Sequence, residues 1–333
     1  MRFHGTAYRG RMTTISDVAA LAGVSKATVS RAFTRPDTVA PATTQRVFDA
    51  SRKLGFVPNS AARQLARGRT GIIALVVPTL NNSFFTPIIS GAQERAHELD
   101  LQLTVAVHPL SGTEELAAFE RLSRQVDGFI VAAPWGTDDI LRMAGMFKPL
   151  VLVDRETEGM TSVIADTASA FQELASHLLT QGHRHVCYVG GPERSWQDPL
   201  RLAAVREAAE RGGAQVTALG PFPATFESGL AVSGAIRDCG ATAVIPYATA
   251  IGLGIQFALL SEGVGKLPVV TSETPVARAL GQAQTPVVDV DGEALGRVTV
   301  DQLAESIESP AAPARQIRLP VPVHIDPSAE SSD

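Results

Sequence analysis

The chain has 333 residues, of which 45% are hydrophobic, so it is long enough for two or three globular units with cores of their own. Its formal net charge of −5 hides an uneven distribution. Residues 1–70 hold 12 Lys and Arg against 3 Asp and Glu, whereas the rest of the chain holds 17 against 31. A basic segment joined to an acidic body predicts a polyanionic partner for the segment and a different partner for the body.

The composition argues against a secreted or membrane-spanning protein. No apolar run approaches the length of a membrane span, and the first residues lack the apolar run of a signal peptide. Cys187 and Cys239 lie in apolar surroundings, which is typical of buried free thiols in a reducing compartment. We therefore expect a cytoplasmic protein with a loose basic arm at 1–11; translation could start at Met1 or at Met12.

Residues 14–33 predict two short helices around a tight turn. Thr14 is a good N-cap with Asp17 in the first turn, Gly23 supplies the turn, and Ser25 caps the second helix. The inward faces are formed by Ile15, Val18, Ala19, Ala22, Val29 and Phe33. The outer face of the second helix carries small and basic residues. This pattern predicts a helix-turn-helix, whose second helix enters the DNA major groove.

Residues 41–54 predict a third helix, with Pro41 at its first position and Gly55 as its stop. Ala40 is a poor N-cap and costs this helix about 1 kcal/mol against Ser. Together the three helices make a small headpiece over residues 12–57.

Residues 58–70 predict a linker with a short helix. Leu65 is the single large apolar residue between Asn59 and Arg69, so a helix here is marginal alone and forms against a partner. The alternative is a connector that is simply exposed.

From Gly71 onward, short apolar runs alternate with amphipathic segments. The expected strands lie at 72–77, 103–107, 129–132, 150–153, 186–189, 216–219, 243–245, 269–271 and 316–319. The expected helices lie near 85–99, 113–125, 138–147, 168–181, 198–211, 227–238, 249–263 and 292–307. Continuously apolar strands are typical of parallel sheets covered on both faces. The pattern predicts two doubly wound subdomains, with a ligand cleft outside the carboxyl ends of the strands, and a disordered tail at 326–333.

Two segments carry a family resemblance. They read Thr14-Ile-Ser-Asp-Val-Ala-Ala-Leu-Ala-Gly-Val-Ser-x-x-Thr-Val-Ser-Arg31 and Gly55-Phe-Val-Pro-Asn-x-x-Ala-Arg-x-Leu65. They resemble the LacI/GalR (lactose/galactose repressor) family of bacterial transcription regulators. The body resembles the effector domain of that family through Asn82-Ser-Phe-Phe85, Val126-Asp-Gly-Phe-Ile130, Val151-Leu-Val-Asp154, Gly182-His-Arg-His185, Gly190-Gly-Pro192 and Arg201-Leu-Ala203.

The resemblance implies an α/β protein with a three-helix helix-turn-helix headpiece and a hinge helix. Two doubly wound α/β subdomains of the periplasmic-binding-protein type follow, interleaved over 71–325, for effector binding and dimerisation. It implies double-stranded DNA with a palindromic operator as partner, a sugar or sugar-like effector and no cofactor. Family tetramers use a C-terminal leucine-rich helix that the Pro- and Ser-rich tail lacks, so we expect a homodimer.

The resemblance places base-reading residues at Lys26, Ala27 and Arg31. Arg31 suits a bidentate contact with a guanine edge, and Lys26 can donate to the same acceptors. The alternative is that both contact only phosphates, which receive more than half of protein–DNA hydrogen bonds. The remaining expected DNA contacts of the headpiece are Ser16, Ser25, Thr28 and Ser30.

Leu65 corresponds to a family residue that is pushed into the minor groove at the centre of the operator. Such an apolar wedge unstacks a base step at a cost of about a few kcal/mol, offset by the contacts of bent DNA. Asn59, Ala62 and Arg63 lie beside it in the sequence and are expected near the backbone and groove.

The resemblance also implies an effector site. Phe84 and Phe85 would form an apolar wall, and Asp154 and Arg201 would contact polar ligand atoms. The residues expected to complete it are Trp196 or Phe226, for stacking on a ring, and Glu273. The sequence departs from the family at Ala248-Thr249, where relatives carry Asn-Asp, and at Thr271-Ser-Glu-Thr274, where they carry Gly-x-Asp-Asp; Glu273 would substitute for the missing Asp.

Other signals and functions are weaker. His183-x-His185-x-Cys187 aligns three potential metal ligands but lacks a fourth, and Gly252-x-Gly254 lacks a phosphate-loop context, so we expect neither a metal site nor an enzyme. A periplasmic-type solute-binding protein is disfavoured by the headpiece. The sequence leaves open activation or repression, induction or corepression, and control by a protein partner in place of a small molecule.

Overall fold

The computed structural model describes residues 13–34, 36–56, 68–263, 267–270 and 286–325. The chain divides into two compact units between Gly68 and Arg69, inside the segment predicted as a linker. Some predictions lie outside the described residues and stay predictions: the arm 1–11, the tail 326–333, and the contacts of Asn59, Ala62, Arg63, Leu65 and Glu273.

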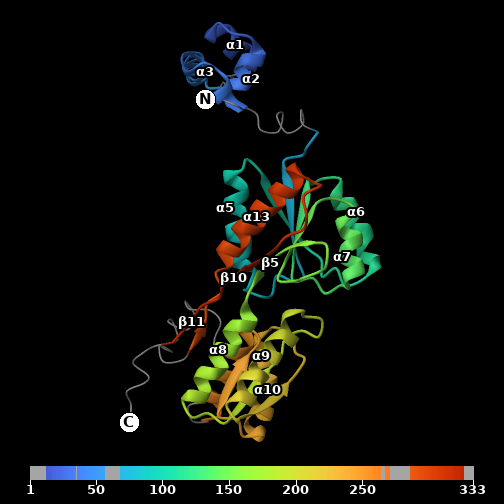
Figure 1. The fold of residues 1–333 in the computed structure, drawn as a ribbon, viewed down its shortest axis with the longest axis vertical. Helices are drawn as coiled ribbons and strands as arrows, with labels where there is room; N and C mark the ends of the chain where they lie inside the picture. Colours follow the sequence, from blue (N-terminus) through green and yellow to red (C-terminus); the bar gives the residue numbers. More distant parts are fainter. Residues whose placement is uncertain (1–12, 35, 57–67, 264–266, 271–285, 326–333) are drawn as a thin grey trace, which may run out of the picture. The chain divides into compact units, whose positions relative to one another are not determined.

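The first unit contains the predicted helices (Figure 1). They are α1 (Ile15–Ala22), α2 (Lys26–Thr34), the 3-10 turn η1 (Pro36–Thr38) and α3 (Pro41–Leu54). At the start of α1, the Thr14 hydroxyl accepts the Asp17 amide at 3.4 Å and the Asp17 carboxylate accepts the Thr14 amide at 2.8 Å. This reciprocal pair is a capping box. Gly23 follows α1 with φ +66°, which glycine adopts without steric cost.

The core of this unit is formed by all three helices. Val18 of α1, Val29 of α2 and Val47 of α3 are fully buried, and the Phe33 and Phe48 rings lie 5.3 Å apart between their centroids. These buried side chains confirm the predicted inward faces, and they leave the opposite side of α2 exposed. Ala40 forms no side-chain cap on α3, as predicted.

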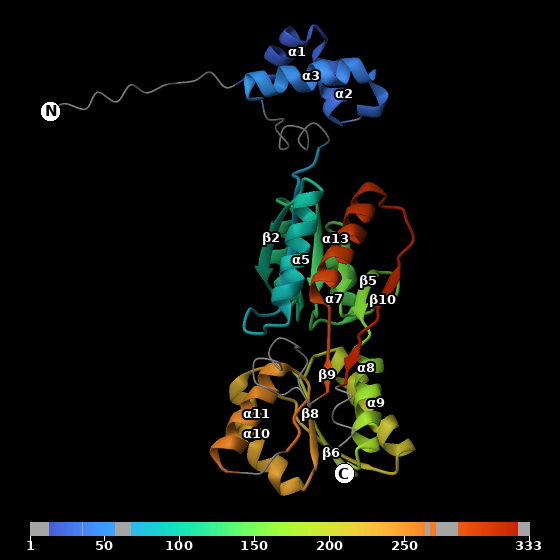
Figure 2. The ribbon, with the colours of Figure 1, turned by 90° about the vertical axis from the view of Figure 1, so that its left-hand side faces the viewer.

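The second unit, Arg69–Asp333, has two lobes, each built around its own sheet. The first lobe contains β1 (Ile72–Val77), α5 (Phe85–Glu98), β2 (Gln102–Val107), η2 (Thr113–Glu115), α6 (Leu116–Ser123), β3 (Gly128–Ala132), α7 (Asp138–Gly145), β4 (Leu150–Val153), β5 (Thr161–Ala165), α13 (Gly292–Glu308) and β10 (Gln316–Leu319). Among the described residues its strands form a parallel sheet in the order β10-β5-β4-β3-β1-β2. Helices α5 and α13 cover one face, where they lie side by side (Figure 2), and α6 and α7 cover the other (Figure 1).

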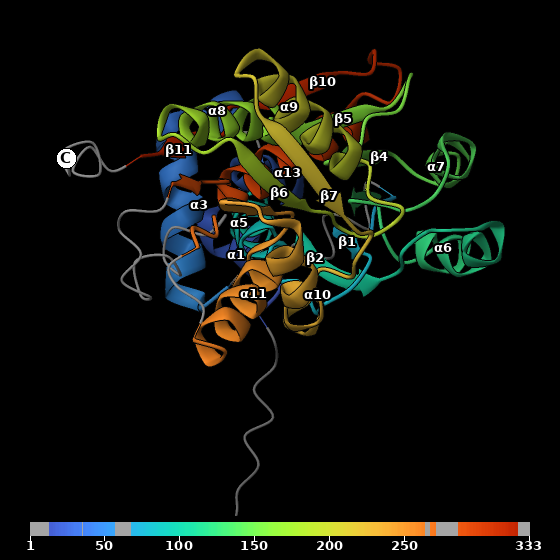
Figure 3. The same ribbon diagram turned by 90° about the horizontal axis from the view of Figure 1, so that it is seen from below.

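The second lobe contains α8 (Thr167–Thr180), β6 (His185–Val189), α9 (Gln197–Arg211), β7 (Gln215–Leu219), α10 (Phe226–Cys239), β8 (Ala243–Pro246), α11 (Thr249–Ser261), β9 (Val287–Val288) and β11 (Val323–His324). Its described parallel sheet has the order β7-β6-β8, and β9 pairs with β11 in antiparallel fashion. Helices α8 and α9 lie on one side of this sheet and α10 and α11 on the other (Figure 3).

The predicted strands and helices match these elements to within a few residues, with four exceptions. The strands β5, β9 and β11 were not predicted; β5 reads Thr-Ser-Val-Ile-Ala and the other two have two residues each. The strand expected at 269–271 is reduced to a single parallel bridge between Val269 and Val244, and Thr271 lies outside the described residues.

Three described segments of chain cross between the lobes and are hydrogen-bonded to one another. They are residues 165–167, 289–292 and 319–323. The Asp166 amide donates to the Leu319 carbonyl at 2.9 Å, and the Asp289 amide donates to the Pro322 carbonyl at 2.9 Å. The crossings therefore lie together, next to the carboxyl ends of strands from both lobes.

Candidate functional sites

The exposed side of α2 is the candidate DNA-reading surface. Lys26, Ala27, Ser30 and Arg31 are exposed on it, as predicted, whereas Thr28, expected on the same face, is half-buried. The Arg31 Nε donates to the Ala27 carbonyl at 3.3 Å, so this guanidinium lies back along its own helix. Its long side chain carries several further N–H donors, which can contact a base edge or a phosphate.

The Ser25 and Thr28 side chains form hydrogen bonds at the start of α2. The Ser25 hydroxyl accepts the Thr28 amide at 3.1 Å and lies 2.9 Å from the Thr28 hydroxyl. Ser16, on α1, is half-buried. The expected contacts of these three residues with DNA stay predictions, and these bonds show that Ser25 and Thr28 also stabilise the turn.

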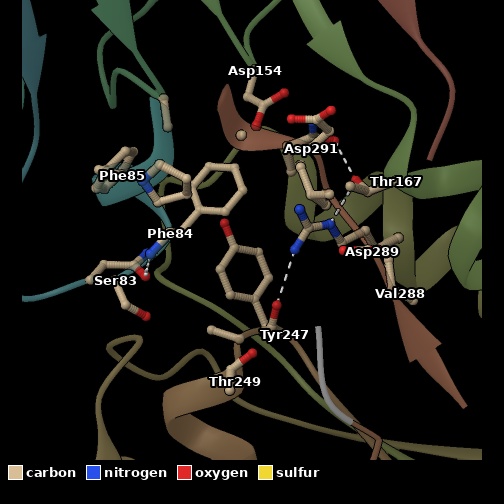
Figure 4. Close-up of a pocket in the computed structure, with 18 of the residues that line it drawn as sticks. Ser83, Phe84, Phe85, Asp154, Thr167, Tyr247, Thr249, Val288, Asp289 and Asp291 are labelled. Atoms are coloured by element: carbon tan, nitrogen blue, oxygen red, sulfur yellow. Dashed lines mark hydrogen bonds between the residues drawn. The ribbon is translucent and has the colours of Figure 1, made fainter. Parts of the chain in front are cut away.

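A cavity of about 680 Å³ lies among the crossing segments and strand ends of the second unit (Figure 4). Its walls come from both lobes. Four of the predicted effector residues line it: Phe84, Phe85, Asp154 and Arg201. Its volume lies within the ~300–1,000 Å³ range of small-molecule sites, so the cavity has the size and position expected of an effector site.

Asp154 presents an unsatisfied oxygen in this cavity. The side chain is 2% exposed; its Oδ1 accepts the Ala165 amide at 2.9 Å, and its Oδ2 is buried without a hydrogen-bond partner. Burial raises the pKa of this carboxyl, while the Ala165 amide, the charge of Arg201 and the Gln197 side chain act in the opposite direction. Such an oxygen has a strong tendency to bind a donor from a ligand.

The backbone is strained where the chain leaves the strands at this edge. Asp154 follows β4 with φ +52°, and Ala133 follows β3 with φ +43°; both line the cavity. A positive φ costs a residue with a Cβ about 1–3 kcal/mol and is typical of functional sites. The strain is consistent with a binding role for this edge of the sheet.

Arg201 is the fixed cation of the cavity. Its side chain is buried, its Nε donates to the Thr167 hydroxyl at 2.9 Å, and its Nη1 donates to the Tyr247 carbonyl at 3.0 Å. The guanidinium carbon lies 5.0 Å from the Phe171 ring centroid and 4.7 Å from that of Tyr247, so the guanidinium forms cation–π contacts with both rings.

The aromatic walls differ from those predicted. Neither Trp196 nor Phe226 lines this cavity. Trp196 precedes the first residue of α9, and Phe226 is exposed at the start of α10 with its ring 5.8 Å from that of Phe257. Tyr247 and Phe171 line the cavity in their place (Figure 4 shows Tyr247 near Phe84). Tyr247 directly follows β8, and this position at the carboxyl end of a predicted strand is the signal that could have identified it.

The departure from the family pattern at Ala248-Thr249 also lies in the cavity wall. Both residues line it, and Ala248 is the N-cap of α11 without a side-chain cap. The Ala and Thr that stand in place of the Asn-Asp implied by the resemblance are therefore both part of the cavity wall. Further polar lining residues that the sequence analysis did not single out are Thr167, Gln197, Asp289, Asp291, Glu293 and His324.

A second cavity of about 640 Å³ adjoins the first. The two share Asn82, Phe85, Ala133 and Tyr247 in their walls. The residues that belong to the second cavity include Trp135 from the first lobe and Phe222 from the second, with Pro192, Pro221 and Pro223.

The signals that we rejected have structural explanations. His183 and His185 pair with the hydroxyls of Thr242 and Thr217, at 3.0 and 2.8 Å, and the described residues contain no cluster of three potential metal ligands. A Cβ at Gly254 would lie 2.1 Å from the Phe226 carbonyl, so this glycine allows α10 and α11 to pack closely. Cys187 is a buried free thiol, and burial raises its pKa to about 12.

Fold and sites together define a DNA-reading helical unit joined to a two-lobed small-molecule-binding body. Two family profiles match the chain: "Bacterial regulatory proteins, lacI family" over residues 14–59, and "Periplasmic binding proteins and sugar binding domain of LacI family" over residues 70–326. The chain therefore belongs to the LacI family of DNA-binding transcriptional regulators. Among the described residues, no helix is long and apolar enough to cross a membrane.

Individual relatives agree with this assignment. The maltose regulon regulatory protein MalI of Escherichia coli K12 is 31% identical over 270 residues, covering 75% of this chain and 76% of MalI. A solved complex of the transcriptional regulator CelR with cellobiose is 27% identical with a TM-score of 0.68, covering 94% of this chain and 98% of CelR. The Lac repressor dimer bound to operator and the anti-inducer ONPF has the same fold, with a TM-score of 0.75 at 24% identity and coverage of 96% and 99%.

Proposed function

We propose that this protein is a cytoplasmic, homodimeric repressor that binds a palindromic operator and is controlled by a carbohydrate-type small molecule. The proposal of a small-molecule effector rests on two groups that line the same cavity. They are the Asp154 Oδ2, which has no hydrogen-bond partner, and the Arg201 guanidinium, which contacts two aromatic rings. A carboxylate acceptor and a guanidinium donor, placed among aromatic rings, suit a ligand with several hydroxyl groups and apolar ring faces.

The structure of the body supports a coupling between ligand and DNA. Residues 69–71, where the body begins, are held by the first lobe: the Thr70 and Gly71 amides donate to the Asp127 carboxylate at 2.8 and 2.7 Å. Arg69 forms an ion pair with Glu308 and donates to the Ile307 carbonyl. A ligand that binds one arrangement of the lobes better than another shifts their equilibrium. Through residues 69–71 that shift reaches the hinge at 58–68.

Exposed apolar side chains support the homodimer. Phe257 and Leu260 of α11 are 58% and 77% exposed, and Phe226 of α10 lies against Phe257. In the first lobe, β2 is an edge strand whose Val105 and Val107 are exposed. Apolar helix faces and unpaired apolar edges are normally covered in solution, and we propose that a second copy of the chain covers these.

The hinge prediction is part of the same proposal. If Leu65 is an apolar wedge, L65A should lower operator affinity at least tenfold and reduce DNA bending, because no apolar side chain then inserts between the unstacked base pairs. Gel shift on circularly permuted operator fragments measures both properties. Equal bending and affinity in L65A would contradict the wedge.

The effector part is tested by calorimetric titration of the full chain with mono- and disaccharides, followed by operator binding with and without the sugars that bind. We expect at least one sugar to bind and to change operator affinity; the sign of the change distinguishes induction from corepression. Binding without any change in operator affinity would contradict the proposed control.

A further inference from the structure

A groove of about 560 Å³ lies on the first lobe, at the edge of the sheet opposite the effector cavity. Leu150 and Thr161, the first residues of β4 and β5, line the groove, whereas the effector cavity is lined by Asp154, which follows β4. The carboxyl-terminal ends of α7 and α13 complete its walls. None of the described residues that line the groove also lines either of the cavities above. Neither DNA reading nor effector binding therefore accounts for it.

Part of the groove wall is apolar and is fixed by packing. Phe147 and Met160 line it and pack against the core between the sheet and helices α6 and α7. Met160 also lies against the end of α7, because a Cβ at Gly145 would be 3.3 Å from the Met160 Cε. Met146 lines the same groove and is 82% exposed. The apolar part of a ligand would therefore find a preformed surface here.

The polar side chains of the groove are donors. Lys148 is partly buried, and its ammonium has no hydrogen-bond or ion-pair partner among the residues that the structure describes. The Thr161 hydroxyl accepts the Arg315 amide at 3.3 Å, which leaves its O–H able to donate. The Ser309 hydroxyl supplies a further donor, and the described lining residues include no carboxylate. This donor set is complementary to an anion.

The carboxylates of α13 that lie close in sequence to the groove residues are already paired. Glu305 forms an ion pair with Arg315 at 2.8 Å, and Glu308 forms one with Arg69. Neither carboxylate is therefore available to Lys148. Lysine is rarely buried, even in part, without a counter-ion, so the groove has a place for a negative charge that the described residues do not fill.

The groove adjoins the residues that anchor the start of the body. Ser306 and Ser309, which line it, flank two residues that hold Arg69. The Ile307 carbonyl accepts an Arg69 N–H at 3.0 Å, and Glu308 forms an ion pair with the same guanidinium. A ligand that contacts this end of α13 better in one arrangement of the anchor than in another shifts the balance between them.

We propose that this groove is a second regulatory site, which binds a small phosphate monoester with an apolar body. The phosphate lies on Lys148 and the hydroxyls of Thr161 and Ser309, and the apolar body lies on Phe147 and Met160. Phosphate presents three strong acceptor oxygens, which suits an ammonium and two hydroxyl donors, and the volume is that of a small-molecule site. This site goes beyond the proposed function, because it does not depend on the carbohydrate effector.

The site is tested by isothermal titration of the full chain with phenyl phosphate, inorganic phosphate, phenol and benzoate at constant ionic strength. Phenyl phosphate should bind at least about tenfold more tightly than inorganic phosphate or phenol, because only it contacts both the donors and the apolar wall. K148M keeps the length of the side chain but removes its charge, and it should weaken phenyl phosphate about tenfold. K148R should retain most of the binding. K53M removes an exposed lysine of α3 and should bind as the wild type does.

The regulatory role is tested by operator affinity, measured by fluorescence anisotropy at the same ionic strength. Saturating phenyl phosphate should change the operator affinity of the wild type about fivefold. K148M at the same concentration of phenyl phosphate should show no change, because its groove lacks the cation that holds the ligand.

Four outcomes would overturn parts of the inference. Absence of phenyl phosphate binding would overturn the site, as would equal binding by K148M and the wild type when thermal unfolding shows K148M folded. Tighter binding of benzoate than of phenyl phosphate would overturn the assignment to phosphate. Binding without a change in operator affinity would overturn the regulatory role. Each result leaves the proposed operator and carbohydrate binding in place, because neither uses the groove.

Discussion

The DNA-reading unit and the effector cavity are assembled over very different distances along the chain. The candidate DNA contacts of α2 lie within residues 25–31, and the bonds that shape this surface, between Ser25 and Thr28 and between Ala27 and Arg31, join residues three or four apart. The cavity combines residues from Asn82 to His324. Hydrogen bonds between near neighbours and packing within three consecutive helices shape the first site, whereas the second exists only when strands and helices far apart in sequence have packed.

The largest effect is expected where a substitution disturbs packing between helices that are far apart in sequence, such as α5 and α13. A Cβ at Gly296 of α13 would lie 2.2 Å from the Ile88 carbonyl of α5, so G296A must push these helices apart. We expect a loss of about 3 kcal/mol in the free energy of unfolding of the body, measured by calorimetry of the full chain.

G234A is the matched control for G296A. A Cβ at Gly234 of α10 would meet only the end of the Arg237 side chain, at 3.7 Å. The same substitution should therefore stabilise the protein there by about 0.5–1 kcal/mol through helix propensity. Equal effects of G296A and G234A on the free energy of unfolding would show that the close contact between α5 and α13 does not determine the stability of the body.

The DNA-reading side is tested by R31A. Loss of a bidentate guanine contact should cost about 1–3 kcal/mol and relax the preference at one base position, whereas loss of a phosphate contact weakens binding to all sequences alike and lowers the salt slope. Fluorescence anisotropy with operator variants at several salt concentrations separates the two. K26A is the parallel variant. Unchanged operator affinity in both R31A and K26A would contradict the prediction that α2 reads the DNA.

The cavity side is tested by D154N, which keeps an Oδ1 acceptor for the Ala165 amide. Replacing a charged acceptor should weaken sugar binding about tenfold. Because burial raises the pKa of this carboxyl, the wild type gains stability from it at low pH and loses that contribution as pH rises through the folded-state pKa. D154N should therefore melt at a higher temperature than the wild type at pH 7, and the difference should shrink in acid.

D139N is the control, since Asp139 is an exposed residue of α7 outside both cavities. If D154N bound sugar as tightly as D139N, the unpartnered Oδ2 would not be a ligand contact. A wild type that melted above D154N at pH 7 would show instead that the charged carboxylate stabilises the fold.

The smallest expected effect concerns the local capping of α1. T14A removes the hydroxyl that accepts the Asp17 amide and should cost about 1 kcal/mol. Hydrogen exchange of the α1 amides in the full chain measures this loss, and amides of the body should be unchanged. Protection factors equal to wild type would show that tertiary packing, and not the cap, fixes the start of α1.

Periodicity, capping residues and continuous apolar runs were sufficient to predict the headpiece helices and most strands and helices of the body. These signals work because each depends on bonds or burial patterns within a few residues. The same local reasoning missed β5, whose Thr and Ser weaken the apolar run, and the two-residue strands β9 and β11, which exist only through pairing with distant segments.

Family resemblance and the rule that ligands bind at strand carboxyl ends led us to expect Phe84, Phe85, Asp154 and Arg201 at one site. All four line the cavity, and their contacts with an effector stay predictions. Tertiary packing alone decided which aromatic rings join them: Tyr247 enters because Gly191 leaves space for its ring, whereas Trp196 and Phe226 lie outside. The orientation of a helix on a sheet selects the side chains that reach a shared cavity. That orientation depends on contacts between elements far apart in sequence, which no local pattern encodes.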